Sequence, residues 1–138
     1  MLLAVVYHFL QPLDSVRFTR SNQFLLSKQA SDGGWGESYL SCITKEYQTT
    51  GSNVVNTSWA LLALMKGGCR DAAAVRRGIE FLTSKQLSTG DWAQENISGI
   101  FNRTTGITYT AYRNVFPIWA LGVYTHHYLP TITAAPPA

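Results

Sequence analysis

One segment occurs twice in this chain, and this repetition restricts the fold more than any other feature. Residues 20–35 read RSNQFLLSKQASDGGW, and residues 77–92 read RGIEFLTSKQLSTGDW. Aligned without a gap, each residue of the first copy meets a residue 57 positions later, so that Arg20 meets Arg77 and Trp35 meets Trp92. Identities at most positions and a fixed offset indicate an internal structural repeat.

The residues that follow each copy are also alike. Trp59-Ala60-Leu61 follows the first copy, and Trp119-Ala120-Leu121 follows the second. The repeated unit is therefore predicted to be a helix, a loop from glutamine to tryptophan, an irregular stretch and a second helix. One helical pair cannot bury its apolar face alone, so the units must stack, and the sequence predicts an all-α array.

Spacing and end signals support these helices. One predicted helix has Val75, Ile79, Leu82 and Gln86 on the same face. The first three of these residues are apolar, and Gln86 is the polar residue at the end of the face. Asp71 is a suitable N-cap for this helix, and Gly67 and Gly68 are expected to end the preceding one. Pro117 is expected either to start the straight part of the last helix or to kink it.

We call residues 29–35 clasp 1 and residues 86–92 clasp 2. Their shared residues are Gln29, Gly33 and Trp35 in clasp 1, and Gln86, Gly90 and Trp92 in clasp 2. The glycines permit a sharp reversal of the chain, and the tryptophan is expected to fold back over the turn. The glutamine side chain is expected to reach backbone groups left open at the helix end. We interpret all six residues as structural rather than catalytic.

Composition excludes several classes of function. Charged residues make up 14% of the 138 residues, against about 25% in an average domain. This fits a piece of a larger body, or a protein that meets a membrane or an apolar ligand. The net charge of +3 without a basic run argues against nucleic acid as a partner. Nothing demands a metal or cofactor, and Cys42 and Cys69, which form no CxxC pair, are expected to be reduced thiols.

The two clasps resemble the QW motif of squalene and oxidosqualene cyclases. The strings DGGWGESYLSC, NTSWALLAL, GDWAQENISGIFN and YTAYRNVFPIWALG resemble, in order and spacing, the C-terminal part of a eukaryotic oxidosqualene cyclase of the lanosterol-forming type. The resemblance implies that residues 16–125 are the C-terminal part of an α/α barrel (toroid) domain. Residues 126–138 would be a tail. Residues 1–15 do not resemble the family and are predicted to be a poorly ordered or mispredicted head.

The resemblance also implies an activity and a location. Members of the family convert (S)-2,3-oxidosqualene to lanosterol or a related triterpene through a cascade of carbocations, without a cofactor. They bind peripherally to the surface of the endoplasmic reticulum membrane or of lipid droplets. The first residues of this chain are apolar over about ten positions, whereas a membrane-spanning helix needs roughly 20.

By the same resemblance, Phe101, Tyr109 and Tyr112 line the substrate cavity. Phe101 would face a cation formed midway in the cascade, and the tyrosines would form the cavity wall and orient the final deprotonation. Their spacing of three predicts that both tyrosines lie on one helix face. The family's catalytic acid lies in an Asp-Cys-Thr-Ala-Glu motif, which does not occur in these 138 residues. We therefore assign no catalytic residue and expect the isolated chain to be inactive.

Other interpretations remain open at this point. The chain could be a catalytically dead module that binds a sterol or isoprenoid, or that pairs with a complete cyclase. From pattern alone, the three aromatic residues would be a plain core stripe. A carbohydrate-active α/α barrel would need two carboxylates across one cleft. Acids in the clasp loops are instead expected to cap helices: Asp32, Glu37, Asp91 and Glu95.

Overall fold

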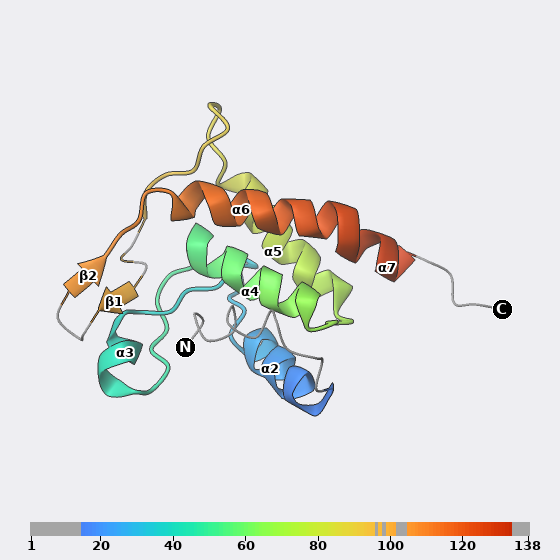
Figure 1. Ribbon diagram of the computed structural model, residues 1–138, viewed down its shortest axis with the longest axis horizontal. Coiled ribbons are helices and arrows are strands. Elements are labelled where there is room, and N and C mark those ends of the chain that lie inside the picture. The colour runs from blue at the N-terminus through green and yellow to red at the C-terminus, as the bar shows by residue number, and fades with distance from the viewer. Residues whose placement is uncertain (1–14, 96, 98, 102–104, 134–138) are drawn as a thin grey trace.

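The computed structural model describes residues 15–95, 97, 99–101 and 105–133, which are almost entirely helical (Figure 1). The helices are α2 (Ser15–Ser27), α3 (Leu40–Thr44), α4 (Val54–Lys66), α5 (Ala72–Ser84), α6 (Tyr112–Val123), the π-helix η2 (Tyr124–Tyr128) and α7 (Leu129–Thr133). Two short strands, β1 (Gly99–Phe101) and β2 (Thr105–Ile107), complete the order. The predicted all-α class is confirmed. The predicted head falls outside the described residues, except for Ser15 at the start of α2.

The sequence repeat appears directly in the structure as α2 and α5. Each helix has 13 residues, and the two begin at positions 57 apart, Ser15 and Ala72. Asp71 caps α5 as predicted, because its carboxylate accepts a hydrogen bond from the Ala74 N–H at 2.9 Å. The repeat therefore specifies both the length and the position of the first helix in each unit.

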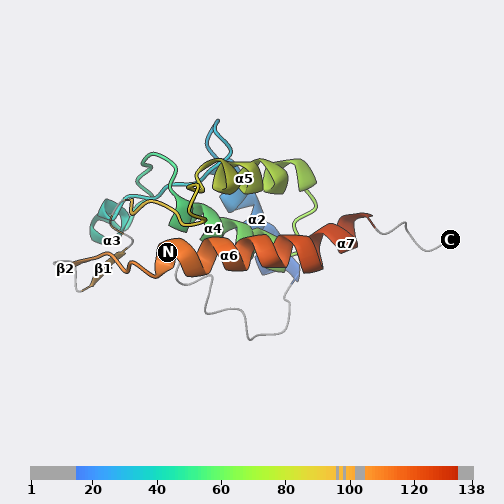
Figure 2. The same ribbon diagram turned by 90° about the horizontal axis from the view of Figure 1, so that it is seen from above.

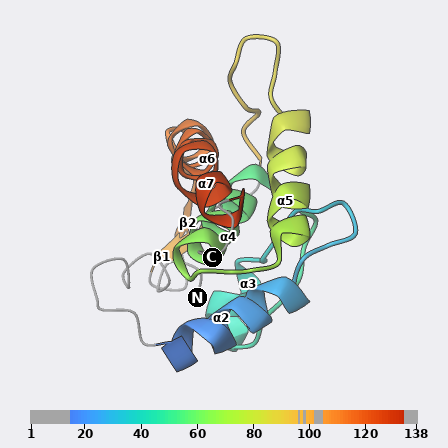
Figure 3. The same ribbon diagram turned by 90° about the vertical axis from the view of Figure 1, so that its right-hand side faces the viewer.

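Helix α4 forms the centre of the molecule. It lies between α5 and α6 when viewed from above (Figure 2), and α2 packs below it (Figure 3). Every residue from Val54 to Met65 is buried, so this helix has no solvent face. Asn53 caps its start by accepting from the Asn56 N–H at 2.8 Å, and Gly67 is its C-cap. A helix that is buried on all sides needs partners all round, which α2, α5 and α6 supply.

The last helix continues further than the sequence predicts. Helix α6 begins at Tyr112, passes through the buried Pro117, and joins η2 and α7 in one rod that ends at Thr133. Helical structure therefore extends beyond residue 125, where the predicted domain ends. In η2, the Tyr128 hydroxyl donates to the Cys69 carbonyl at 2.8 Å, and burial raises the pKa of Tyr128 to about 12. This contact ties the rod to the turn after α4.

The irregular stretches contain small elements that periodicity does not reveal. Helix α3 follows clasp 1, and the hairpin of β1 and β2 follows clasp 2, with Ile100 opposite Gly106. Each strand has three residues, so the hairpin does not change the fold class. Among the described residues, no helix combines the length and the apolar character that crossing a membrane requires.

Candidate functional site

Clasp 1 reverses the chain through a closed set of hydrogen bonds. The Gln29 side-chain N–H donates to the Gly33 carbonyl at 2.9 Å, and the Gly33 N–H donates to the Ala30 carbonyl at 3.0 Å. Gly33 has φ +86°, a conformation that favours glycine. The Trp35 indole N–H donates to the Leu25 carbonyl in the last turn of α2 at 2.7 Å. The indole therefore closes the loop onto the helix from which it emerges.

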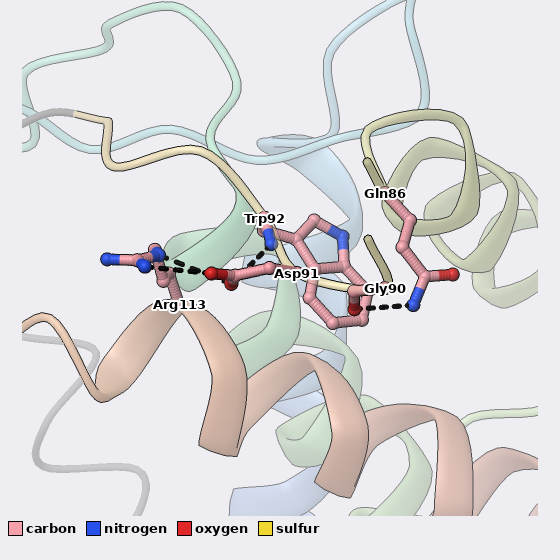
Figure 4. Close-up of polar contacts among 5 residues, drawn as sticks. All are labelled: Gln86, Gly90, Asp91, Trp92 and Arg113. Atoms are coloured by element: carbon pink, nitrogen blue, oxygen red, sulfur yellow. Dashed lines mark hydrogen bonds and ion pairs between the residues drawn. The ribbon is translucent and has the colours of Figure 1, made fainter. Parts of the chain in front are cut away.

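Clasp 2 repeats this set bond for bond. The Gln86 side chain donates to the Gly90 carbonyl at 2.9 Å (Figure 4). The Trp92 indole donates to the Leu82 carbonyl at 2.9 Å. Gly90 also has φ +86°. In both clasps the tryptophan, and not the glutamine as predicted, bonds to a carbonyl in the last turn of the helix, and this carbonyl also accepts from the Lys28 or Lys85 N–H. The glutamine instead binds the glycine carbonyl inside its own turn.

The two clasps differ in what they join. In clasp 1, the Gln29 amide also donates to the Ala74 carbonyl of α5 at 2.9 Å, and Arg77 donates to the Gln29 side-chain oxygen at 2.8 Å. A Cβ atom on Gly33 would lie 2.6 Å from the Arg77 carbonyl oxygen, so the loop lies directly on the backbone of α5. Clasp 1 therefore joins one repeat to the next.

Clasp 2 is joined to α6 by an ion pair. Arg113 donates to both oxygens of Asp91, at 2.8 and 3.3 Å, and the Trp92 N–H donates to the same carboxylate at 2.6 Å (Figure 4). The bond from Arg113 lowers the pKa of Asp91, and the same contact raises the pKa of Arg113. The predicted capping role is wrong for Asp91, because its partner is a side chain on another helix.

The other acids in or just after the two clasps are used in different ways. The carboxylate of Glu95 accepts from the Val54 N–H at 2.6 Å, so it caps the start of α4 across the repeat boundary as an acid at a helix N-terminus should. Asp32 instead stabilises its own turn, accepting from the Gly34 N–H at 3.0 Å and from Ser52 at 2.8 Å. One oxygen of Glu37 is buried without a hydrogen-bond partner among the described residues. Of the four acids that were predicted to cap helices, Asp32, Glu37 and Asp91 therefore lie in other surroundings.

Two of the three predicted cavity aromatics, Tyr109 and Tyr112, belong to a larger aromatic cluster at the start of α6. The rings of Tyr109 and Tyr112 lie 5.0 Å apart, and the Tyr112 ring lies edge-on to Phe116 at 5.1 Å and to Trp59 at 6.0 Å. Tyr109 precedes α6, so the two tyrosines do not share a helix face as predicted, although the structure brings their rings together. Phe101 ends β1, and its side chain lies outside what the structure describes.

Trp59 and Phe116 were not predicted as members of this cluster. Trp59 is 4% exposed, and its indole N–H is buried without a hydrogen-bond partner among the described residues. Its ring lies edge-on to Phe116 at 5.4 Å. The spacing of four between Tyr112 and Phe116 was the available signal, because residues four apart meet on a helix.

This cluster can stabilise positive charge. Tyr109 is 52% exposed, whereas Tyr112, Phe116 and Trp59 are partly or fully buried, so the Tyr109 ring is open and these three rings lie behind it. The face of an aromatic ring is negative and is not nucleophilic, so it attracts a cation without reacting with it. Among the described residues, no three His, Cys, Asp or Glu side chains converge on a metal position.

Comparison with known proteins identifies the family. The profile of the squalene-hopene cyclase C-terminal domain matches residues 2–126. This range includes most of residues 1–15, which the resemblance from the sequence leaves outside the family.

Curated relatives are similar over a small part of their own length. The lanosterol synthase of Homo sapiens is 50% identical over 111 residues, which are 80% of this chain and 15% of that protein. The lanosterol synthase of Mus musculus is 54% identical over 106 residues, 76% of this chain and 14% of that protein. The cycloartenol synthase of Dictyostelium discoideum is 50% identical over 95 residues, 68% of this chain and 14% of that protein. The chain thus corresponds to a small C-terminal portion of such proteins, which confirms the resemblance, and it belongs to the squalene-hopene cyclase C-terminal domain family.

Proposed function

We propose that this chain supplies the C-terminal part of an oxidosqualene cyclase, which converts (S)-2,3-oxidosqualene to lanosterol or a related polycyclic triterpene without a metal or cofactor. The names of the relatives, lanosterol synthase and cycloartenol synthase, support this reaction class. The chain spans 14–15% of their length, so the remaining barrel and the proton donor must come from elsewhere in the complete enzyme.

The arrangement of aromatic rings at the start of α6 carries this proposal. Ring closure by carbocations needs a wall that attracts positive charge and does not form a bond with it. Tyr109 would present such a wall, with its ring tilted against that of Tyr112. Edge-to-face contacts with Trp59 and Phe116 would hold Tyr112 in turn. Phe101 would face a cation formed midway, and the tyrosines would orient the final deprotonation.

The clasps have a different role in this proposal. Among the described residues, the side chains of Gln29 and Trp35 donate only to backbone carbonyls, and Gln29 also accepts a bond from Arg77. They would hold neighbouring helices in register while the reaction proceeds, without contact with the substrate. Clasp 2 would do the same for α5 and α6 through Asp91 and Arg113.

A chimeric enzyme tests the proposal. Residues 16–125 would replace the corresponding segment of mouse lanosterol synthase, and triterpenes formed from oxidosqualene would be identified by mass spectrometry. Tyr109→Leu and Tyr112→Leu each remove a ring, whereas Tyr39→Leu removes an exposed ring outside the cluster as the matched control. A desolvated cation–π contact contributes about 2 kcal/mol, which corresponds to a roughly 30-fold loss in kcat.

The outcomes separate the two parts of the proposal. If the chimera and the Tyr39 control form a triterpene while the cluster variants lose kcat or change product, both parts are supported. Equal activity in all four proteins would overturn the role of the tyrosines. A folded chimera without any triterpene product would overturn the reaction class. The isolated 138-residue chain is expected to form no product, because it does not contain the acid motif.

A second function is favoured by the exposed side of α6. Val115 and Ile118 are large apolar residues on this helix, and Ile118 is 61% exposed. Such a surface suits an isoprenoid or sterol ligand, or the helices of a complete cyclase. Saturable binding of radiolabelled lanosterol by the isolated chain, lost in Ile118→Asp, would support a binding module. Binding that does not saturate would exclude it.

We also propose a location for the complete enzyme, at the surface of the endoplasmic reticulum membrane or of lipid droplets. Members of the family bind there peripherally, and the low charged fraction of this chain, 14%, is compatible with a body that meets an apolar phase. A fluorescent fusion of the complete protein should co-localise with markers of these membranes. A diffuse signal would contradict the proposal.

A further inference from the structure

A short segment after α5 bonds to the first turns of two other helices. We call residues 91–95 the bridge segment. At one end, the Asp91 carboxylate accepts from Arg113, the second residue of α6, at 2.8 and 3.3 Å. At the other end, the Glu95 carboxylate accepts from the N–H of Val54, the first residue of α4, at 2.6 Å. The bridge segment therefore ties the beginning of α4 to the beginning of α6.

The Asp91 end of the bridge segment is fixed in place before Arg113 reaches it. The Asp91 carbonyl accepts from the Leu87 N–H at 2.8 Å, and its carboxylate accepts from the Trp92 N–H at 2.6 Å. Trp92 is itself buried, and its indole bonds to the Leu82 carbonyl of α5. The carboxylate therefore presents a fixed target, which Arg113 binds through two nitrogens at once (Figure 4).

Helix α6 has no side-chain cap of its own. Its N-cap residue is Ala111, which cannot accept a hydrogen bond through its side chain. The start of α4, in contrast, has Asn53 as its cap and Glu95 as a further acceptor. The pair of Asp91 and Arg113 therefore gives the first turn of α6 a fixed contact that the helix does not provide for itself.

The two helix starts carry the rings of the aromatic cluster. Trp59 lies on α4, and Tyr112 is the first residue of α6, with the centres of these rings 6.0 Å apart. Phe116, one turn further along α6, lies 5.4 Å from Trp59. The open ring of Tyr109 lies 5.0 Å from that of Tyr112. A movement of the start of α6 against α4 would therefore displace both tyrosines relative to Trp59.

The first repeat makes the corresponding connection without charge. The Trp35 N–H donates to the hydroxyl of Thr57 on α4 at 2.9 Å, and the Glu37 N–H donates to the amide oxygen of Asn56 at 3.0 Å. Both acceptors are neutral side chains of the helix, whereas the acceptors in the second repeat are carboxylates of the loop. Neutral bonds can thus hold such a loop on a helix, and the charged pair occurs in the repeat that carries the tyrosines.

We propose that Asp91, Arg113 and Glu95 are positioning residues for the cyclisation, which place the aromatic cluster by fixing the starts of α4 and α6. Their role rests on the proposed cyclase function and adds residues that act through the aromatic rings without touching the substrate. The side chains of Asp91 and Arg113 are 34% and 21% exposed, and such a pair contributes little to stability. Placement has a larger effect, because a displacement of about 1 Å can slow an enzyme about 100-fold.

Fluorine NMR of the full 138-residue chain tests the placement without relying on the reaction. The chain is labelled with 3-fluorotyrosine, and the signals of Tyr109 and Tyr112 are assigned by their disappearance in Tyr109→Phe and Tyr112→Phe. Three bridge variants, Asp91→Asn, Arg113→Gln and Glu95→Ala, each release one end of the bridge segment. Each of them should shift both tyrosine signals, because the environment of the two rings changes when α6 moves against α4.

Two arginine variants separate placement from general destabilisation. Arg76→Gln removes an exposed charge of α5, and Arg77→Gln breaks the bond to Gln29 and so loosens clasp 1. Both should leave the Tyr109 and Tyr112 signals in place, although Arg77→Gln lowers the melting temperature. Tyrosine signals that stay in place in all three bridge variants would overturn the proposal. Equal shifts in Arg77→Gln would also overturn it, because they would show an effect of lost stability alone.

The chimera with mouse lanosterol synthase tests the consequence for catalysis. Asp91→Asn and Arg113→Gln should each lower kcat at least about tenfold with KM nearly unchanged, because a displaced ring no longer meets the cation in the transition state. The double variant should lose no more than either single variant, since both break the same pair. Arg113→Lys, which keeps the charge, should recover part of the loss. Arg76→Gln should behave as the unchanged chimera.

The outcomes distinguish this proposal from the cyclase function on which it rests. A folded chimera without any triterpene product would overturn the cyclase function, and the fluorine signals would still decide whether the bridge segment places the tyrosines. An active chimera in which no bridge variant lowers kcat would overturn the positioning role alone. Losses that add in the double variant would overturn the claim that Asp91 and Arg113 act as one pair.

Discussion

Gly33 and Gly90 offer a matched pair of substitutions, because they have the same backbone conformation in different surroundings. Both have φ +86°, so alanine at either position is strained by about 1–2 kcal/mol. Alanine also restricts the unfolded chain equally at both positions, and this effect cancels in the comparison. The difference between the two variants therefore measures only what surrounds each clasp.

The structure predicts a larger loss for Gly33→Ala. The added Cβ atom would lie 2.6 Å from the Arg77 carbonyl oxygen, which is backbone and cannot rotate away, so clasp 1 must move off α5. This movement breaks the bonds of Gln29 with Ala74 and Arg77, each contributing about 1 kcal/mol. We expect Gly33→Ala to reduce the free energy of unfolding by about 3–4 kcal/mol, and Gly90→Ala by about 1–2 kcal/mol.

Urea denaturation followed by circular dichroism provides the measurement. It should be made at low protein concentration, so that contacts between chains do not contribute, and the midpoints should be compared at a common slope. Gly68→Ala is a third reference, since Gly68 has φ +66° and open space at its Cβ position but lies outside both clasps. Equal losses for Gly33 and Gly90 would refute the reasoning, because they would show that contact with α5 adds nothing.

Three further predictions follow from buried or paired groups. Arg113 lowers the pKa of Asp91, so the ionised carboxylate stabilises the fold above its unfolded pKa of about 4, and this contribution disappears as pH falls through the folded pKa. Asp91→Asn should therefore lose less stability on acidification than the wild type. An unchanged pH profile of the melting temperature would contradict this. Tyr128→Phe should lower the free energy of unfolding by about 1 kcal/mol, through loss of the bond to Cys69. The pKa of Tyr128 is raised from its unfolded value of about 10 to about 12 in the folded protein. The free energy of unfolding of the wild type should therefore decline as pH rises from about 10 to about 12, and that of the variant should decline less. Leu61→Ala should cost about 2–5 kcal/mol by chemical denaturation, since Leu61 is fully buried in α4, and a smaller loss would mean that the core collapses around the cavity.

Local signals in the sequence were sufficient for α4 and α5. Asp71 and the glycines after α4 mark helix ends through hydrogen bonds to residues near them in sequence, so each could be predicted from neighbouring residues alone. Because α2 repeats the sequence of α5, the same helix could then be predicted for α2. An offset that holds over a whole helix is stronger information than the propensity of any single residue.

Contacts between distant segments could not be predicted in this way. Asp91 and Arg113 are 22 residues apart, and Glu95 and Val54 are 41 apart, so no periodicity connects them. The assignment of Tyr109 to the same helix face as Tyr112 was wrong for a related reason. A spacing of three implies a shared face only if both residues are helical, and α6 begins at Tyr112.

The cap that Glu95 provides for α4 has a consequence for the order of folding. In a simple repeat protein each unit can form with its neighbours in any sequence. Here the N-terminus of the central helix receives its carboxylate partner from a residue 41 positions later, beyond the second clasp. While the chain emerges from the ribosome, α4 therefore stays incompletely capped until Glu95 has been synthesised. The backbone amide of Val54 should exchange its hydrogen quickly in nascent chains that end before Glu95, and slowly once that residue is present, which makes it a single-site reporter of when the two repeats become one cooperative unit.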